Sequence, residues 1–279
     1  MLPLPPYTME RDTMNTELET VMRLAQRAGK EIMSQYGLQK KIELKEDNTP
    51  VTEADKAANR IILEGLVDVF PHDGIISEEM ETITGDRSWY VDPLDGTKGF
   101  INRTDQFAIH IGLAIDAKPV FGLIYKPTTG EAYYGIEDEG AFYRGLGHKV
   151  PLHINRENPD RRIAVVGISF TDDEDGRDIM KKLTPTSILH SGSEGLRIMK
   201  LVENIGDLHL TNKNRLGTWD VCAPQAILEA AGGVIVGTDG KPIEYVGQRK
   251  VGRDIYVTRT EEQKNYMLER LGDLSLPIH

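Results

Sequence analysis

Apolar side chains recur at three- and four-residue steps over two stretches near the N-terminus, a spacing that predicts two amphipathic helices. The first stretch runs from Asn15 to Gly37, and glycine is a common residue just beyond a helix. The second begins at Thr52, which has an acidic residue, Asp55, three positions later, as in a capping box. Pro71 ends the second helix, because proline disfavours a helical conformation in the residue before it.

Short apolar runs with turn residues between them predict strands in the middle of the chain. Residues 107–114 alternate between large and small side chains, which is typical of a half-buried strand. A turn at 126–130 separates two further runs and predicts a hairpin. The expected strands are 74–76, 88–91, 107–114, 120–125 and 131–136, and the second of them is expected to end at Asp92-Pro93.

The C-terminal part alternates between strand-like and helix-like segments, which predicts mixed sheets with helices layered on them. A polar stretch at 155–162 precedes the first of these strands and marks a boundary. We therefore predict an α/β protein with an N-terminal half over residues 1–158 and a C-terminal half over residues 159–279. In the second half, strands are expected at 163–166, 234–236 and 254–257, and helices at 193–204, 219–231 and 261–271.

The charge balance narrows the classes of partner. The 279 residues include 33 Lys and Arg against 44 Asp and Glu, a formal net charge of −11. A surface of this sign repels nucleic acid polymers and anionic membranes, so we expect neither as the main partner. A negatively charged small substrate is compatible with it only where bound cations or a local basic pocket reverse the field.

The single cysteine, Cys222, excludes an intrachain disulfide framework and a cysteine-based zinc site. No apolar run approaches the roughly 18 residues that a membrane-spanning helix needs. The first residues lack the basic and apolar regions of a signal peptide. We therefore expect a cytoplasmic protein, with Cys222 buried in a helix as a small apolar side chain.

The densest chemical signal is the sequence DPLDGT at 92–97, which follows an apolar strand. Two carboxylates three positions apart, stiffened by a proline, can hold oxygen ligands at a fixed separation, as Mg²⁺ requires. The backbone N–H groups of Gly96 and Thr97 come directly after them and could cradle a phosphate. The alternative interpretation is an ordinary turn after a strand.

Two further acids stand at the ends of predicted elements. Glu78 follows another short apolar segment, and Asp220 opens an apolar helix. Each of them alone is typical of a solvated turn or a helix cap. If these two meet Asp92 and Asp95, repulsion and desolvation cost several kcal/mol unless cations neutralise the group. Two or three Mg²⁺ ions would do so and would form a centre for phosphoryl hydrolysis.

Four motifs in order resemble the inositol monophosphatase superfamily over about residues 18–260. They are DNTPVTEAD at 47–55, SEE at 77–79, DPLDGT at 92–97, and WDVCAP at 219–224 with AAGG at 230–233. Within that superfamily the chain is most similar to the CysQ-type 3′(2′),5′-bisphosphate nucleotidases, which also share GLIYKP at 122–127 and Gly192-Ser193 before a helix. The resemblance implies the five-layer α/β/α/β/α sugar-phosphatase fold and a Mg²⁺-dependent phosphatase.

The resemblance also implies a role for each matching residue. The metal ligands would be the carboxylates of Glu78, Asp92, Asp95 and Asp220 and the carbonyl of Leu94. Asp55 and Thr97 would together orient the attacking water, and Glu79 would support them. Asp47 would lie near a third, looser ion. The alternative for Asp55 is helix capping alone, and His110, which has no second imidazole at ligand spacing, is expected to be structural.

For the substrate, the resemblance implies adenosine 3′,5′-bisphosphate, a small phosphorylated metabolite that would lose its 3′-phosphate to give AMP. Inositol monophosphatases carry a glutamate shortly before the Trp-Asp pair, whereas this chain has a basic residue there, and a cation suits a second phosphate better than a sugar hydroxyl. A solvated basic loop is the alternative interpretation. The expected substrate contacts are Gly96, Thr97, Gly192, Ser193, and either Lys213 or Arg215, depending on the alignment.

Alternatives to this assignment remain. Related phosphatases act on inositol 1-phosphate, fructose 1,6-bisphosphate or histidinol phosphate. A non-catalytic metal- or nucleotide-binding regulator is another alternative, although it would have no need of the Asp55–Thr97 pair. At Gly99 the chain departs from many CysQ-type relatives, which carry glutamate there. Sensitivity to Li⁺, a place in sulfur metabolism and a homodimeric state are further properties that the resemblance implies.

Overall fold

The computed structural model describes residues 11–38, 42–44, 50–83, 85–158, 160–211 and 215–272. Its helices are α1 (Arg11–Gln35), α2 (Glu53–Val69), α3 (Thr97–Ile101), α4 (Glu174–Leu183), α5 (Glu194–Val202), α6 (Thr218–Ala230) and α7 (Glu261–Leu271). Its strands are β1 (Ile42–Leu44), β2 (Pro50–Thr52), β3 (Gly74–Ser77), β4 (Met80–Ile83), β5 (Arg87–Asp95), β6 (Ala108–Ile115), β7 (Lys118–Lys126), β8 (Glu131–Ile136), β9 (Gly140–Gly145), β10 (His148–Leu152), β11 (Ile163–Gly167), β12 (Ser187–Ser191), β13 (Leu208–Leu210), β14 (Val234–Gly237) and β15 (Ile255–Thr258).

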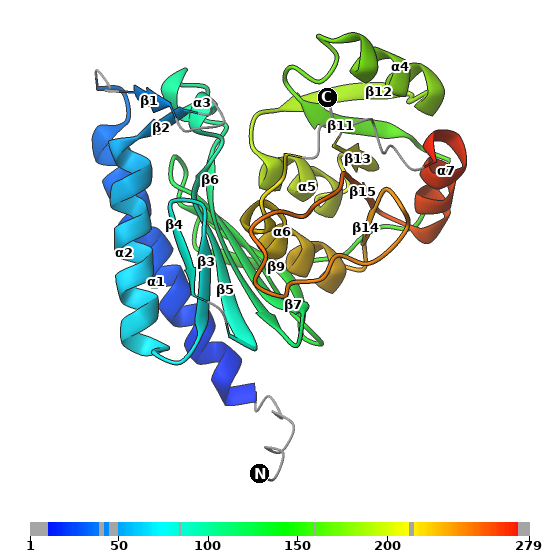
Figure 1. Ribbon diagram of the computed structural model, residues 1–279. Coiled ribbons are helices and arrows are strands. Elements are labelled where there is room, and N and C mark those ends of the chain that lie inside the picture. The colour runs from blue at the N-terminus through cyan, green and yellow to red at the C-terminus, as the bar shows by residue number, and fades with distance from the viewer. Residues whose placement is uncertain are drawn as a thin grey trace.

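Two large sheets alternate with three layers of helices (Figure 1). Helices α1 and α2 cover one face of an eight-stranded sheet, and α6 and α5 lie on its other face. Helices α5 and α6 also contact a five-stranded sheet, which carries α4 and α7 on its far side. Three clusters of buried apolar side chains fill the spaces between the layers, and one of them includes residues of both sheets around α5 and α6. The predicted five-layer α/β/α/β/α fold is therefore confirmed.

Strand β5 carries two of the predicted metal ligands through the middle of the larger sheet. The strand order is β10-β9-β8-β7-β6-β5-β3-β4, with β5 antiparallel to β6 and parallel to β3. The register of β5 against β6 shifts between Asp92 and Asp95. The strand thus continues through Asp95, and the prediction that it ends at Asp92-Pro93 is wrong. An irregularity of this kind bends a strand and re-aims its side chains.

Helix α6 lies unusually close to the sheet because three glycines face it. Gly112, Gly122 and Gly135 are direct neighbours across β6, β7 and β8. A Cβ atom on Gly122 would lie 2.2 Å from the carbonyl oxygen of Ala223, and one on Gly135 would lie 2.6 Å from Ile227 Cα. Only glycine permits this approach of two backbones. The contact fixes where the first turn of α6 points.

Most elements with a clear hydrophobic period lie where the sequence predicts them, namely α1, α2, α5, α6, α7 and the β7–β8 hairpin. The predictions omitted the helices α3 and α4 and the strands β1, β2, β4, β9, β10, β12 and β13. Strands β10 and β12 are mostly exposed, and β13 has three residues, so the sequence pattern offers little period to detect. None of the described helices is long and apolar enough to cross a membrane. The division into halves between residues 158 and 159 stays a prediction.

Candidate metal centre

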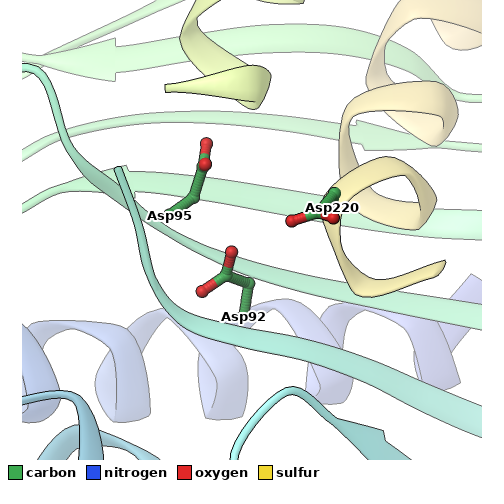
Figure 2. Close-up of side chains that lie close together, drawn as sticks. All are labelled: Asp92, Asp95 and Asp220. Atoms are coloured by element: carbon green, nitrogen blue, oxygen red, sulfur yellow. The ribbon is translucent and has the colours of Figure 1, made fainter. Parts of the chain in front are cut away.

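Three aspartates from separate parts of the chain meet where β5 ends and α6 begins. Carboxylate oxygens of Asp92, Asp95 and Asp220 all lie within 4.8 Å of one another. The first two stand on β5, and Asp220 reaches towards them from the first turn of α6 (Figure 2). Among the described residues, no other group of three His, Cys, Asp or Glu side chains is close enough to share a metal ion.

The electrostatics of this group is unfavourable without a cation. Burial raises the pKa of Asp92 well above its ordinary value, and the negative charges of Glu78 and the other two aspartates raise it further. Burial likewise raises the pKa of Asp220, and the charges of Glu78 and Asp95 add to the shift. A divalent cation would turn this repulsion into attraction. The set of carboxylate oxygens therefore fits Mg²⁺, which prefers such ligands.

Asp95 is held differently from its two neighbours. Its Oδ2 atom accepts hydrogen bonds from the Ser193 hydroxyl and from the backbone N–H of Gly195 (3.0 Å), and it lies 3.1 Å from His110 Nε2. Burial alone would raise the pKa of Asp95, but His110, Ser193 and Arg197 outweigh it and leave that pKa below its ordinary value. Asp95 is thus fixed in orientation and ready to bind a cation as a carboxylate.

The turn between β3 and β4 places Glu78 near enough for its charge to act on Asp92 and Asp220, but its carboxylate is not one of the three that lie within 4.8 Å of one another. Its backbone N–H donates to the carbonyl oxygen of Val91 (3.2 Å), directly beside Asp92. The next residue, Glu79, donates from its backbone N–H to Ser77 Oγ (3.4 Å). Both glutamates line an open recess of about 640 Å³. On the other side of the aspartates, the Leu94 carbonyl accepts a hydrogen bond from Thr97 Oγ1 (3.3 Å).

Asp55 caps a helix and contacts the centre at the same time. Its Oδ2 atom accepts from the backbone N–H (2.8 Å) and hydroxyl (2.6 Å) of Thr52, which forms the predicted cap of α2. Its Oδ1 atom accepts from Thr97 Oγ1 (3.1 Å). Burial raises the pKa of Asp55, while its hydrogen bonds with Thr52 oppose the shift. The two interpretations of this residue, cap and active-site base, are therefore compatible.

The predicted substrate contacts are distributed around the centre. Gly96 has a φ of 91° and precedes α3. Gly192 donates from its backbone N–H to Gln106 Oε1 (2.6 Å), and the buried Ser193 hydroxyl is occupied by Asp95. Arg215 is exposed at the edge of a separate recess. Lys213 and Asp47 lie outside the described residues.

The departure at Gly99 has a steric reason. A Cβ atom on this residue would lie 2.5 Å from the backbone carbonyl oxygen of Gln106. The same carbonyl oxygen would lie 2.5 Å from a Cβ atom on Gly96. A glutamate at position 99 would therefore require the segment around Gln106 to move. The Gln106 side chain, which accepts the hydrogen bond from the Gly192 N–H, would move with it.

A recess that is lined by two arginines and two acids, Glu194 and Asp254, adjoins the acidic centre. It has a volume of about 280 Å³ and is lined by residues that include Glu194, Arg197, His209 and Arg215. Glu194 lies between Ser193 and Gly195, the two residues that bind Asp95, so the recess and the aspartates share the first turn of α5. The guanidinium of Arg197 donates to the Ser191 carbonyl (2.8 Å) and to Glu194.

Glu194 stands in a buried network of charges that holds this recess together. Its carboxylate accepts from Arg197 and lies 2.5 Å from His209 Nε2, while His209 Nδ1 lies 2.7 Å from the carbonyl oxygen of Val165. Both ring nitrogens of His209 thus face oxygen atoms. Burial alone would raise the pKa of Glu194, but the charges of Arg197 and His209 lower it far below its ordinary value.

Replacing Glu194 by Gln is expected to destabilise the protein. The substitution leaves the Arg197 guanidinium without its anion in a largely buried site, which costs about 3–5 kcal/mol of unfolding free energy. Because the folded pKa of Glu194 is lowered, its contribution is complete above about pH 4.5 and is lost as the pH falls towards the folded pKa. Urea denaturation at pH 7 and at lower pH measures both effects.

Glu64→Gln, at an exposed position of α2, is the matched control and should change the unfolding free energy little. Equal unfolding free energies for Glu194→Gln and the parent protein at pH 7 would contradict the charge network.

Sequence reasoning missed several residues that contact the centre. His110 was expected to be structural, yet its Nε2 atom lies against Asp95. Glu194, Arg197 and Gln106 were not singled out at all. In a single sequence, only the positions of Glu194 and Arg197 hint at a role. They stand one turn apart at the start of a predicted helix, directly after Gly192-Ser193. Nothing in the sequence places them beside strands that are far away along the chain.

Comparisons with known proteins agree with this geometry. Residues 14–271 match the inositol monophosphatase family. The chain is 34% identical over 240 residues to the 3′(2′),5′-bisphosphate nucleotidase CysQ of Haemophilus influenzae. The aligned region covers 84% of this chain and 89% of that protein. It is 33% identical over 216 residues to the histidinol-phosphatase of Streptomyces coelicolor. That aligned region covers 74% of this chain and 80% of the relative.

Solved structures show the same fold. An IMPase from Thermotoga maritima superimposes with a TM-score of 0.77 at 23% identity, covering 93% of this chain and 100% of that one. The structure of 2′-AMP-bound SaIMPase-II superimposes with a TM-score of 0.75 at 26% identity, covering 92% of this chain and 94% of that one. With its family matched over almost the whole length and its carboxylates gathered at one point, this chain belongs to the inositol monophosphatase family and is a metal-dependent phosphatase.

Proposed function

We propose that the protein is a Mg²⁺-dependent nucleotidase that removes the 3′-phosphate of adenosine 3′,5′-bisphosphate to give AMP. The observation that carries this choice of substrate is the exposed Arg215 at the recess beside the acidic centre, where Arg197 is already paired with Glu194. In a chain with a net charge of −11, an exposed arginine near the metal centre favours a substrate that carries a second phosphate. The similarity to CysQ nucleotidases supports the same choice.

The proposed metal ligands are the carboxylates of Asp92, Asp95, Asp220 and Glu78 and the carbonyl of Leu94, for two or three Mg²⁺ ions. When bound, Mg²⁺ supplies a Lewis acid for the phosphate and a water of lowered pKa. Burial and the neighbouring negative charges raise the pKa of Asp92, and a bound cation would remove this repulsion between the carboxylates.

Asp55 and Thr97 are the proposed pair that orients the attacking water. The Thr97 hydroxyl donates to Asp55 Oδ1 at 3.1 Å, which leaves the lone pairs of Oγ1 free to accept a hydrogen bond from water. Thr52 holds the other carboxylate oxygen of Asp55 in place. The raised pKa of Asp55 makes it a stronger base than an exposed aspartate, which suits transfer of a proton through the hydroxyl.

A panel of four phosphate esters tests the substrate. We expect adenosine 3′,5′-bisphosphate to give the highest kcat/KM, ahead of inositol 1-phosphate, fructose 1,6-bisphosphate and histidinol phosphate. One charge-assisted hydrogen bond to the second phosphate contributes about 1.5–3 kcal/mol, or roughly 10–100-fold in kcat/KM. If histidinol phosphate or inositol 1-phosphate is hydrolysed best, the nucleotidase assignment is wrong while the metal-dependent phosphatase stands.

Adenosine 3′-monophosphate provides the matched control, because it lacks only the 5′-phosphate. Arg215→Met should lower kcat/KM for the bisphosphate and leave that for the monophosphate close to the parent value. An equal loss for both substrates would show that Arg215 does not contact the second phosphate.

The remaining properties implied by the family resemblance belong to this proposal as well. They are inhibition by millimolar Li⁺, a place in sulfur metabolism, assembly into a homodimer and a cytoplasmic location. Each is a prediction, and the substrate panel does not depend on any of them.

A further inference from the structure

We infer that Arg249 is a positioning residue that ties the Glu78 turn to the start of α6 and thereby sets the geometry of the metal centre. The inference rests on the proposed metal ligands and is independent of the choice of substrate. Arg249 lies in the segment between β14 and β15, far along the chain from Glu78. It lines the same recess as Glu78 and Glu79.

The side chain of Arg249 makes contacts on both sides of the centre. Its guanidinium donates from Nη2 to the Glu78 carbonyl (3.1 Å) and from Nη1 to the Met80 carbonyl. The same guanidinium carbon lies 4.7 Å from the ring centroid of Trp219, the residue before Asp220. A planar cation over an aromatic ring is attracted to its face. One side chain therefore contacts the neighbours of two predicted metal ligands.

The backbone of Arg249 is anchored independently to the beginning of α6. Its carbonyl accepts from the Thr218 N–H (3.0 Å), and the Thr218 hydroxyl donates to the Gln248 carbonyl (2.7 Å). Lys250 and Gly217 form an isolated antiparallel bridge. Gly217 in turn donates to Asp220 Oδ2 (2.6 Å). The segment that carries Arg249 is thus fixed to the residues that orient Asp220, and its side chain extends from there to Glu78.

This arrangement matters because Glu78 has a weaker anchor than the three aspartates. Asp92 and Asp95 stand on a central strand and Asp220 on a packed helix, whereas Glu78 lies in a two-residue turn beside an open recess. A metal ligand in a turn needs outside support to keep its orientation. The forked guanidinium donates to two carbonyls of that turn region at once, which a lysine ammonium does not reproduce in the same plane.

The test measures Mn²⁺ binding by calorimetry on the purified full chain, without any substrate. Arg249→Met should raise the Mn²⁺ dissociation constant about 10–100-fold, the usual effect of removing a residue that orients a ligand. Its melting temperature in EDTA should stay close to that of the parent, because Arg249 is partly exposed. In activity assays, the Mg²⁺ concentration for half-maximal rate should rise, with kcat at saturating Mg²⁺ nearly unchanged.

Two further variants separate positioning from general stability. Arg249→Lys keeps the charge but should still bind Mn²⁺ almost as weakly as Arg249→Met does. Arg60→Met, at an exposed site on α2, should bind Mn²⁺ as the parent does. Parent-like Mn²⁺ affinity in Arg249→Met would overturn the inference. So would a fall in melting temperature in EDTA large enough to account for the weaker binding. The Mn²⁺ calorimetry contains no phosphate ester. Its outcome therefore does not depend on which substrate the protein hydrolyses.

Discussion

Replacing Asp92 by Asn should abolish phosphate hydrolysis and, in EDTA, make the protein more stable. The rate should fall about 10³-fold or more, because a lost metal ligand removes several kcal/mol of charge stabilisation at 1.36 kcal/mol per tenfold. The amide still accepts the hydrogen bond that Leu94 N–H donates to Asp92 Oδ1 (2.9 Å). Relief of one like-charge contact should raise the unfolding free energy by about 1–4 kcal/mol.

The pH dependence of this stability has a definite sign. Because the folded pKa of Asp92 is raised above its ordinary value of 3.8, the folded protein binds more protons than the unfolded chain in that range. The metal-free protein therefore loses stability as the pH rises from about 3.8 through the raised pKa. Asp92→Asn should lack this loss. Urea denaturation in EDTA, over a series of pH values that starts at about 4 and rises, measures the difference.

Divalent cations should reverse the ranking. Saturating Mg²⁺ stabilises the parent by binding to the folded state only, and it should stabilise Asp92→Asn less. Asp68→Asn, at an exposed position of α2, is the control and should alter neither activity nor stability in EDTA. An Asp92→Asn protein that is less stable than the parent in EDTA would show that the carboxylates do not repel one another there.

Replacing Thr97 by Val should lower kcat about 10²–10⁴-fold, the usual contribution of a positioned proton-transfer group. Valine removes the hydroxyl that donates to Asp55 Oδ1 while keeping a similar volume. Asp55 would still cap α2 through its two hydrogen bonds with Thr52, so the fold and the Mg²⁺ affinity should change little. Steady-state kinetics at saturating Mg²⁺, with calorimetry of metal binding, separates the two quantities.

Thr97→Ser is the matched control for the hydroxyl and should retain much of the parent rate. If Thr97→Val and Thr97→Ser lose activity equally, the methyl group or the packing at this site is responsible. A Thr97→Val protein with the parent kcat would exclude the hydroxyl from the orientation of water.

The hydrophobic period of the sequence predicted most of the helices and mixed sheets with helices layered on them, whereas the five-layer arrangement was implied by the family resemblance. Helix α6 lies between the two sheets and is buried almost all round. Helices α2 and α6 also carry their own start signals, Thr52 with Asp55 and Trp219-Asp220. The polar edge strands β10 and β12 carry no such period, since they bury few side chains. Their place is decided by backbone pairing with β9 and β11, which a single sequence does not encode in any visible pattern.

The predicted carboxylates were found through their positions at the ends of elements and through the family motifs. The residues that hold them were harder to predict. His110 contacts Asp95 because β6 pairs with β5 in one particular register, and Ser193 reaches Asp95 from the start of α5. Arg249 lies in an irregular segment with no period at all. Contacts of this kind depend on the packing of elements, which becomes visible only in three dimensions.

Anomalous diffraction from crystals grown with Mn²⁺ would test the central claim most directly. We expect Mn²⁺ peaks about 2.0–2.4 Å from carboxylate oxygens of Asp92, Asp95 and Asp220, with Glu78 turned towards the same ions. Mn²⁺ bound elsewhere on the protein, with these three aspartates making no contact to any ion at saturating concentration, would contradict the account.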